Sequence, residues 1–195
     1  MNYYTMKKML LLLCMTACIC ISGQAQESNH GKDTGADKEL INQKMPPIVI
    51  KEWISEIPDT TGKFILIDFW GTWCYWCVQE IPHLNEIAKE FKDDLVVIGV
   101  ANQTAKDVKK MKKPVIEYYS AADSTSTTIN ECWIDSFPHC KLLAPDKTVI
   151  WEGIPKLPGF ELTKDTIRLL IDKYKKLSSP AKENKTIRKH EQTRK

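Results

Sequence analysis

The stretch FWGTWCYWC, residues 69–77, constrains the fold of this chain more than any other, because it places two cysteines where a strand meets a helix. The preceding residues 63–70 form a nearly continuous apolar run, which is typical of a strand buried on both faces. From Ile81 onward, apolar residues recur at helical spacing. The thiols of Cys74 and Cys77 are therefore expected at the start of a helix that leaves a buried strand.

The rest of the chain alternates short strand patterns with helical ones. The helical stripe after the cysteines continues through Leu84, Ile87, Ala88 and Phe91. Strand and helix patterns followed by a hairpin and a final helix indicate an α/β fold whose sheet is covered on both faces. The other expected elements are strands at Pro46–Ile50, Asp94–Ala101 and Pro114–Tyr119, helices at Thr104–Met111 and near Thr128–Cys132, a hairpin of residues 139–144 and 148–152, and a C-terminal helix over residues 162–177.

The N-terminal residues have the features of an export signal. Two lysines precede the apolar run of residues 9–21, which is shorter than the roughly 20 residues of a membrane-spanning helix. Small residues precede a cleavage position after Ala25, so residues 1–25 are predicted to be a signal peptide. As an alternative, Met15–Cys18 loosely resembles a lipoprotein signal, which would leave a lipid on Cys18 and hold the protein on a membrane.

One globular domain is expected at residues 45–177, after a polar linker at residues 26–44. Residues 178–195 form a basic tail without an apolar face, and we expect this tail to be disordered. The whole chain has a formal net charge of +3, and six of its basic residues lie in the tail. The domain therefore lacks the basic face of a nucleic-acid-binding protein, and no nucleic-acid partner is expected.

Cysteine usage indicates redox chemistry. In an oxidising compartment, a pair separated by two residues is more consistent with a disulfide or a redox couple than with a zinc site. At a helix N-terminus the free backbone N–H groups and the helix dipole stabilise a thiolate at Cys74. Cys77 lies one turn later and deeper. The pattern therefore predicts an exposed nucleophile at Cys74 and a resolving thiol at Cys77.

The other two cysteines of the domain are Cys132 and Cys140. They could form a second disulfide, because an unpaired thiol is a liability in an oxidising compartment. They could also be buried free thiols that pack as small apolar residues, which we favour because Cys140 is expected on a buried strand and Cys132 at the end of a helix.

Three motifs carry a family resemblance: LIDFWGTWCYWC, then EIP, then SFPHCKLLAPDKTVIWEG. Together they resemble the thioredoxin superfamily, and within it the exported TlpA/ResA-type thiol–disulfide oxidoreductases, over residues 45–176. The resemblance implies a thioredoxin-like central mixed sheet flanked by helices on both faces. It also implies an enzyme that needs no cofactor and uses a Cys74–Cys77 redox disulfide. The sequence differs from the family at Trp76, where the usual residue is proline.

The resemblance implies functional roles for two acidic residues, Asp68 and Glu80. Asp68 matches the buried acid of thioredoxin, which implies proton transfer for the resolving cysteine; the alternative is an acid at a strand end that reaches solvent. Burial would raise the pKa of the Asp68 carboxyl, which suits a proton acceptor. Glu80 matches a glutamate that tunes the cysteines in the ResA-like group; the alternative is an exposed acid in the first turn of the helix.

Substrate contacts are expected from the aromatic residues near the cysteines and from a later Phe-Pro pair. Trp73, Tyr75 and Trp76 are expected to form an apolar surface around Cys74. The Phe137–Pro138 bond is expected to be cis, as in the loop that faces the cysteines in the family, with the Phe137 backbone free to pair with an extended substrate. Trp70 is expected in the core.

The resemblance also suggests partners and a location. Protein disulfides or dithiols are the expected substrates, and a membrane-borne thiol reductant is expected to keep the enzyme reduced in the periplasm. Apocytochrome c maturation and general repair of exported proteins both fit. Contact with a membrane is expected only if Cys18 is lipidated.

Rival interpretations use the same cysteines. A thioredoxin-like copper or other metal-binding module could use Cys74, Cys77 and His139, since Cys and His are soft ligands. A zinc site could use all four cysteines of the domain, although a second closely spaced pair is missing. A peroxiredoxin has threonine three residues before its reactive cysteine, whereas here Gly71 holds that position. An interaction module without activity would not need both cysteines.

Overall fold

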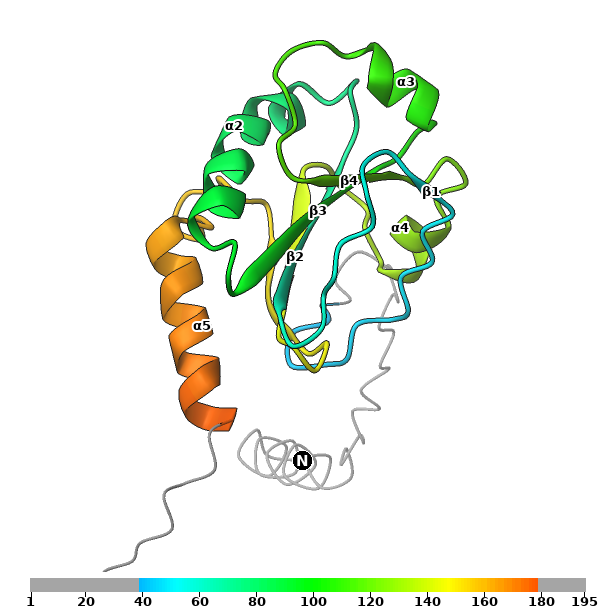
Figure 1. Cartoon of the computed structure of the whole chain (residues 1–195). Coiled ribbons are helices and arrows are strands. Elements are labelled where there is room, and N and C mark those ends of the chain that lie inside the picture. The colour runs from blue at the N-terminus through cyan, green and yellow to red at the C-terminus, as the bar shows by residue number, and fades with distance from the viewer. Residues whose placement is uncertain (1–38, 179–195) are drawn as a thin grey trace, which may run out of the picture. The chain divides into compact units, whose positions relative to one another are not determined.

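The computed structural model describes residues 39–178, and Figure 1 shows how their helices and strands are arranged. The predicted buried strands at residues 63–70 and 94–101 are confirmed, as are the helix that follows the cysteines, the hairpin and the C-terminal helix. In chain order the elements are β1 (Glu52–Trp53), β2 (Phe64–Trp70), α2 (Tyr75–Glu90), β3 (Leu95–Ala101), α3 (Ala105–Lys110), β4 (Tyr119–Ala122), α4 (Thr127–Glu131), β5 (His139–Leu143), β6 (Val149–Gly153) and α5 (Lys164–Ser178).

The strands of this range form one six-stranded mixed sheet in the order β1-β4-β3-β2-β5-β6. Strands β2, β3 and β4 run parallel to one another. Strand β1 is antiparallel to β4, β5 is antiparallel to β2, and β6 is antiparallel to β5. The expected α/β fold is therefore confirmed, with β2 near the middle of the sheet.

Strand β2 is buried along its whole length because β3 and β5 pair with its two edges and core side chains cover both of its faces. Successive side chains of a strand point to opposite faces, so β2 contributes to two separate core clusters. Leu66 and Trp70 belong to the first cluster, and Ile65 and Ile67 belong to the second. The strand thus carries the cysteine loop on a support that is packed from both sides.

The first cluster lies between the sheet and the helices α2 and α5, which Figure 1 shows on the same side of the sheet. Ile81, Leu84 and Ile87 form the buried stripe of α2. Ile167 and Ile171 are the buried residues of α5. Their spacing of three or four residues keeps each set on one helix face, so the two helices cover this face with apolar side chains.

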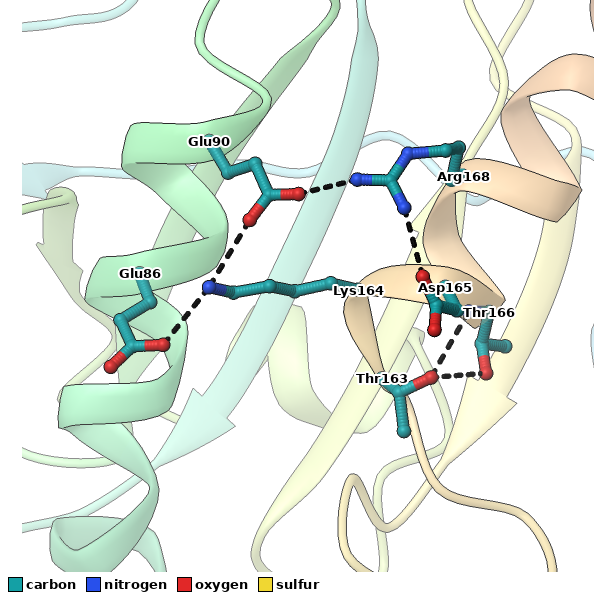
Figure 2. A network of polar contacts seen from close by, with 7 residues as sticks. All are labelled: Glu86, Glu90, Thr163, Lys164, Asp165, Thr166 and Arg168. Carbon is teal, nitrogen blue, oxygen red and sulfur yellow. Dashed lines mark hydrogen bonds and ion pairs between the residues drawn. The ribbon is translucent and has the colours of Figure 1, made fainter.

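Ion pairs also link α5 to α2 (Figure 2). The Lys164 Nζ lies 3.0 Å from Glu86 Oε2 and 3.1 Å from Glu90 Oε2. The Arg168 guanidinium donates to Glu90 Oε1 at 2.5 Å and to Asp165 Oδ1 at 2.8 Å. Because these groups are partly or largely exposed, each pair adds little stability.

The second cluster lies on the opposite face, under α4 and the N-terminal segment of residues 39–50. Ile129 of α4 and Leu40 are both buried in it. The backbone N–H of Leu40 donates to Glu152 Oε1 at 2.6 Å, and the Glu152 carboxylate also pairs with the buried Lys141. Residues 39–44 therefore pack on the domain, and the prediction of a linker that extends to Lys44 is wrong for them.

Two strand predictions are wrong in position. Residues 46–50 form no strand, although Ile48 and Ile50 pack on the second cluster; two prolines begin this segment, and proline has no N–H to donate to a neighbouring strand. The edge strand is β1, two residues further on. The strand expected at Pro114–Tyr119 is instead β4, which begins at Tyr119, the last of these residues, and ends at Ala122.

Some predictions fall outside residues 39–178. These are the signal peptide, the alternative lipid site at Cys18 and the basic tail beyond Ser178. Within the described range, none of the helices combines the length and the apolar character needed to cross a bilayer.

Candidate active site

The two cysteines of the predicted motif lie where β2 passes into α2. Strand β2 ends at Trp70, and Cys74 is the N-cap residue of α2. The Cys74 Sγ accepts a hydrogen bond from the backbone N–H of Cys77 at 3.2 Å, and the two cysteines form a disulfide. The sulfur of Cys74 thus occupies the position that an anion prefers at a helix N-terminus.

The two sulfur-bearing residues differ little in exposure. Cys74 is 8% exposed and Cys77 is 0% exposed, and both belong to the first core cluster. The order of accessibility is as predicted, but the expectation of an exposed Cys74 is wrong for the oxidised protein. The Cys74 sulfur is bonded to Cys77 and accepts a hydrogen bond at the N-cap position, so only a small part of the residue is in contact with solvent.

Exposed aromatic side chains surround the motif, as expected. Trp73, Tyr75 and Trp76 are each more than half exposed. Trp73 packs edge-to-face on Phe137 with ring centroids 5.4 Å apart, and Tyr75 packs in the same way on Trp76 at 5.2 Å. We call Trp73, Tyr75, Trp76 and Phe137 the aromatic surface. Apolar patches that stay exposed are characteristic of interaction sites.

The loop of Phe137 and Pro138 lies next to this surface. The expected cis bond between these two residues is confirmed. Strand β5 starts at His139, directly after the bond, and pairs with β2. The contact between Phe137 and Trp73 therefore joins the cis-proline loop to the cysteine loop across the end of the sheet.

A glutamine that the sequence analysis missed holds the cysteine loop. Gln103 follows β3, and its Oε1 accepts from the backbone N–H of Thr72 at 2.7 Å. Its Nε2 donates to the Thr72 hydroxyl at 3.0 Å. The neighbouring residue Gly71 is constrained as well. A Cβ atom on Gly71 would lie 2.6 Å from Trp73 Nε1, so only glycine leaves room for the indole ring. The one sequence signal for Gln103 was its position just past a strand that runs parallel to β2.

Asp68 lies inside the domain on β2, with its side chain on the face covered by α2. Its Oδ1 accepts from the Cys140 thiol at 3.5 Å, and its Oδ2 accepts from the Tyr118 hydroxyl at 3.5 Å. Burial raises the pKa of the Asp68 carboxyl to about 7; the bond from Cys140 opposes this rise, and the charge of Glu80 adds to it. The alternative of an acid that reaches solvent is wrong, since the residue is 1% exposed.

Glu80 is also buried, although the alternative for it was an exposed acid of the first helical turn. Its side chain is 2% exposed and pairs with His83 Nδ1 and, at 2.9 Å, with Lys156 Nζ. Lys156 comes from the segment between β6 and α5, so this ion pair ties that segment to α2. The Glu80 charge adds to the burial that raises the pKa of both Asp68 and Cys140.

The other two cysteines, Cys132 and Cys140, are buried free thiols, which confirms the favoured interpretation. Cys140 belongs to the first core cluster and Cys132 to the second, so the sheet separates them. A zinc site made of all four cysteines is therefore wrong. Among residues 39–178, no three or more His, Cys, Asp or Glu side chains are grouped so that they could hold a metal ion, and this includes the set with His139.

Comparisons with known proteins agree with this geometry. A model of the AhpC/TSA family matches residues 41–135. The thiol-disulfide oxidoreductase ResA of Bacillus cereus is 30% identical over 146 residues, which are 71% of this chain and 82% of that protein. The thioredoxin-like protein YneN of Bacillus subtilis is 35% identical over 65 residues, which are 33% of this chain but only 38% of that protein.

A solved structure has the same fold. The thioredoxin domain of a thiol-disulfide oxidoreductase from Bacteroides vulgatus superposes with a TM-score of 0.56 at 22% identity, over 68% of this chain and 99% of that domain. This likeness confirms the thioredoxin-like fold. The ResA relative, together with the Cys74–Cys77 disulfide at the start of α2, shows that the chain is a thiol–disulfide oxidoreductase that belongs to the ResA family.

Proposed function

We propose that this protein reduces disulfides of exported proteins, with Cys74 as the nucleophile and Cys77 as the resolving thiol. The observation that carries the proposal is the position of Cys74. It caps α2, receives the N–H of Cys77, and is the more accessible residue of a buried pair next to an exposed aromatic surface. A thiolate at such a position is stabilised by the N-terminus of the helix.

The first step is attack on a substrate disulfide. The Cys74 thiolate bonds to one substrate sulfur, and the other substrate sulfur leaves as a thiolate that takes a proton from solvent. The product is a mixed disulfide between Cys74 and the substrate. The N–H groups at the start of α2 stabilise the attacking thiolate, so Cys74 reacts in preference to the more deeply buried Cys77.

The second step releases the substrate. Cys77 gives its proton to the Asp68 carboxylate and attacks the Cys74 sulfur, which forms the Cys74–Cys77 disulfide and expels the second substrate thiolate. Two electrons have then passed from the enzyme to the substrate. A carboxyl with a pKa of about 7 suits this transfer, because it is ionised in part of the molecules near neutral pH. Glu80 is the charge that adjusts this pKa.

Substrate binding is assigned to the aromatic surface and to the cis-proline loop. An extended segment next to the substrate cysteine can lie on Trp73, Tyr75 and Trp76 while its backbone pairs with that of Phe137, beside Pro138. Contacts of this kind give affinity with little dependence on side-chain identity. They fit an enzyme that acts on protein disulfides of more than one sequence.

The export signal predicted for residues 1–25 supports a role outside the cytoplasm, in the periplasm, with attachment through Cys18 as the alternative. In an oxidising compartment, a reductase needs a source of electrons. We assign this role to a membrane-borne thiol reductant that reduces the Cys74–Cys77 disulfide after each cycle. Apocytochrome c and misoxidised exported proteins are the two substrate groups that the test below distinguishes.

The test is to trap the substrate. The Cys77→Ala variant lacks the resolving thiol, so substrates should accumulate as mixed disulfides on Cys74, to be identified by mass spectrometry after non-reducing separation. Cys74→Ser should abolish both trapping and insulin disulfide reduction, whereas the buried Cys132→Ala serves as the matched control. Undiminished insulin reduction by Cys74→Ser would refute the proposed mechanism. A reduction potential near the strongly oxidising end, about −120 mV, would refute the reductive direction.

A further inference from the structure

Within residues 39–178, the Asp68 carboxyl accepts hydrogen bonds from two side chains to which no catalytic role has been given. One is Cys140, whose thiol donates to Oδ1 at 3.5 Å; the other is Tyr118, whose hydroxyl donates to Oδ2 at 3.5 Å. Both partners are buried, and both belong to the first core cluster, as Cys77 does. The acid is therefore held between a strand on one side of it and a loop on the other.

The sheet register explains why Cys140 reaches this carboxyl. Asp68 of β2 pairs directly with Cys140 of β5, so their side chains point to the same face. Cys140 also follows Pro138 by two residues, which places it on the strand that leaves the cis-proline loop. The thiol thus connects the proton-accepting side chain to the element assigned to substrate binding.

We propose that Cys140, with Tyr118, is a positioning residue that holds the Asp68 carboxyl and sets the pH at which it can take the proton of Cys77. The inference rests on the proposed role of Asp68 in the second step. In this scheme Cys140 takes no part in forming or breaking a disulfide, and it keeps its own proton throughout. Its thiol stays in the neutral form because burial and the Asp68 charge raise its pKa.

The surroundings of the Asp68 carboxyl change its pKa in opposite directions. Donors from β5 and from the loop before β4 stabilise the ionised carboxyl, whereas burial and the Glu80 charge from α2 oppose ionisation. Glu80 itself is held by His83 and Lys156. Removing the Cys140 donor should therefore move proton transfer to higher pH, and removing the Glu80 charge should move it to lower pH. A loss of packing alone would not produce shifts of opposite sign.

The experiment follows the second step separately, in full-length reduced protein with Cys14, Cys18 and Cys20 replaced by serine. The probe is dithiobis(nitrobenzoate), which releases one coloured thionitrobenzoate when Cys74 attacks it and a second when Cys77 resolves the mixed disulfide. The rate of the second release does not depend on probe concentration. Its dependence on pH gives the midpoint for proton transfer in each variant.

For Cys140→Ala we expect the midpoint to rise by about half a pH unit or more, because the carboxylate loses a buried donor. Cys140→Ser keeps a donor at the same place and should bring the midpoint back toward that of the unmodified residue. Glu80→Gln should lower the midpoint. Cys132→Ala, the buried thiol on the other face of the sheet, is the matched control and should leave it unchanged.

The outcomes separate this inference from the proposed function. If Asp68→Asn leaves the second release unaffected, the role of Asp68 in the proposed function is wrong and the inference falls with it. If Asp68→Asn slows that release but Cys140→Ala does not shift the midpoint, only the inference is overturned. Should Cys140→Ala fail to fold, Tyr118→Phe removes the other donor, and an unshifted midpoint there overturns the inference equally.

Discussion

Replacing Asp68 by asparagine should change how the stability of the oxidised protein depends on pH. The pKa of this carboxyl is raised from 3.8 to about 7, with burial as the largest cause. Between these two values, the folded state keeps a proton that the unfolded state loses. Because the folded state binds more protons, the free energy of unfolding of the native sequence should fall as pH rises through this window and become flat above about pH 7.

The size of the effect follows from the shift. It spans about three pH units, and each unit corresponds to about 1.4 kcal/mol, so the buried carboxylate costs the folded state about 4 kcal/mol at alkaline pH. Asparagine has nearly the same shape as the protonated acid and, like it, offers one carbonyl oxygen and one donor group to Cys140 and Tyr118, but it does not ionise. Asp68→Asn should therefore match the native protein at about pH 4 and exceed its stability by up to about 4 kcal/mol at about pH 8.

Guanidinium unfolding, followed by tryptophan fluorescence across this pH range, measures the difference. Asp93→Asn is the matched control for the loss of one carboxylate, since Asp93 is an exposed residue in the turn after α2. A stability difference for Asp68→Asn that stays constant from acid to alkaline pH would refute the reasoning. It would mean that the folded protein accommodates the ionised carboxylate without cost.

Three further changes test other parts of the structure. Glu152→Leu removes the partner of the buried Lys141 and should cost about 3–5 kcal/mol in urea unfolding; the additional change Lys141→Met should recover most of this loss, and no recovery would contradict a buried ion pair. Leu84→Ala should lower the free energy of unfolding by about 2–5 kcal/mol because it opens a cavity under α2, whereas Leu169→Ala, at an exposed position of α5, should change it by less than about 0.5 kcal/mol. Gln103→Leu removes both hydrogen bonds to the cysteine loop and should cost about 1–3 kcal/mol and slow mixed-disulfide formation; an unchanged rate would show that the loop keeps its position without this clamp.

The central part of the fold could be predicted because its signals are long and local. Strand β2 is a run of buried apolar residues, and α2 repeats apolar residues over several turns. The failures fall on short elements at the periphery of the sheet. Residues 46–50 are apolar because they cover the second cluster, and a strand of two residues such as β1 is defined only by its pairing with β4. Pairing between distant segments leaves no local pattern in the sequence.

The candidate site likewise contains residues that could be predicted from local sequence patterns and residues that could not. Cys74 and Cys77 follow from their own motif, and the cis bond before Pro138 was expected from the motif of that loop. Gln103 and Tyr118 were missed because their roles depend on contacts with residues 31 and 50 positions away. Glu80 was left between two interpretations, since its burial depends on Lys156 from a distant segment. Sequence patterns show which residue types are present, whereas these contacts require the folded sheet.

The placement of the four described cysteines also protects the protein from its own chemistry. A reaction that exchanges disulfides could in principle scramble the enzyme's own cysteines. Cys132 is shielded from this because the whole thickness of the sheet separates it from the reactive pair, and burial raises its pKa to about 12. Cys140 lies on the same face of the sheet as the pair. Burial and the Asp68 charge raise the pKa of its thiol, so the thiol stays protonated and is a poor nucleophile. Separation by the sheet for one thiol and protonation for both therefore disfavour an internal side reaction during catalysis.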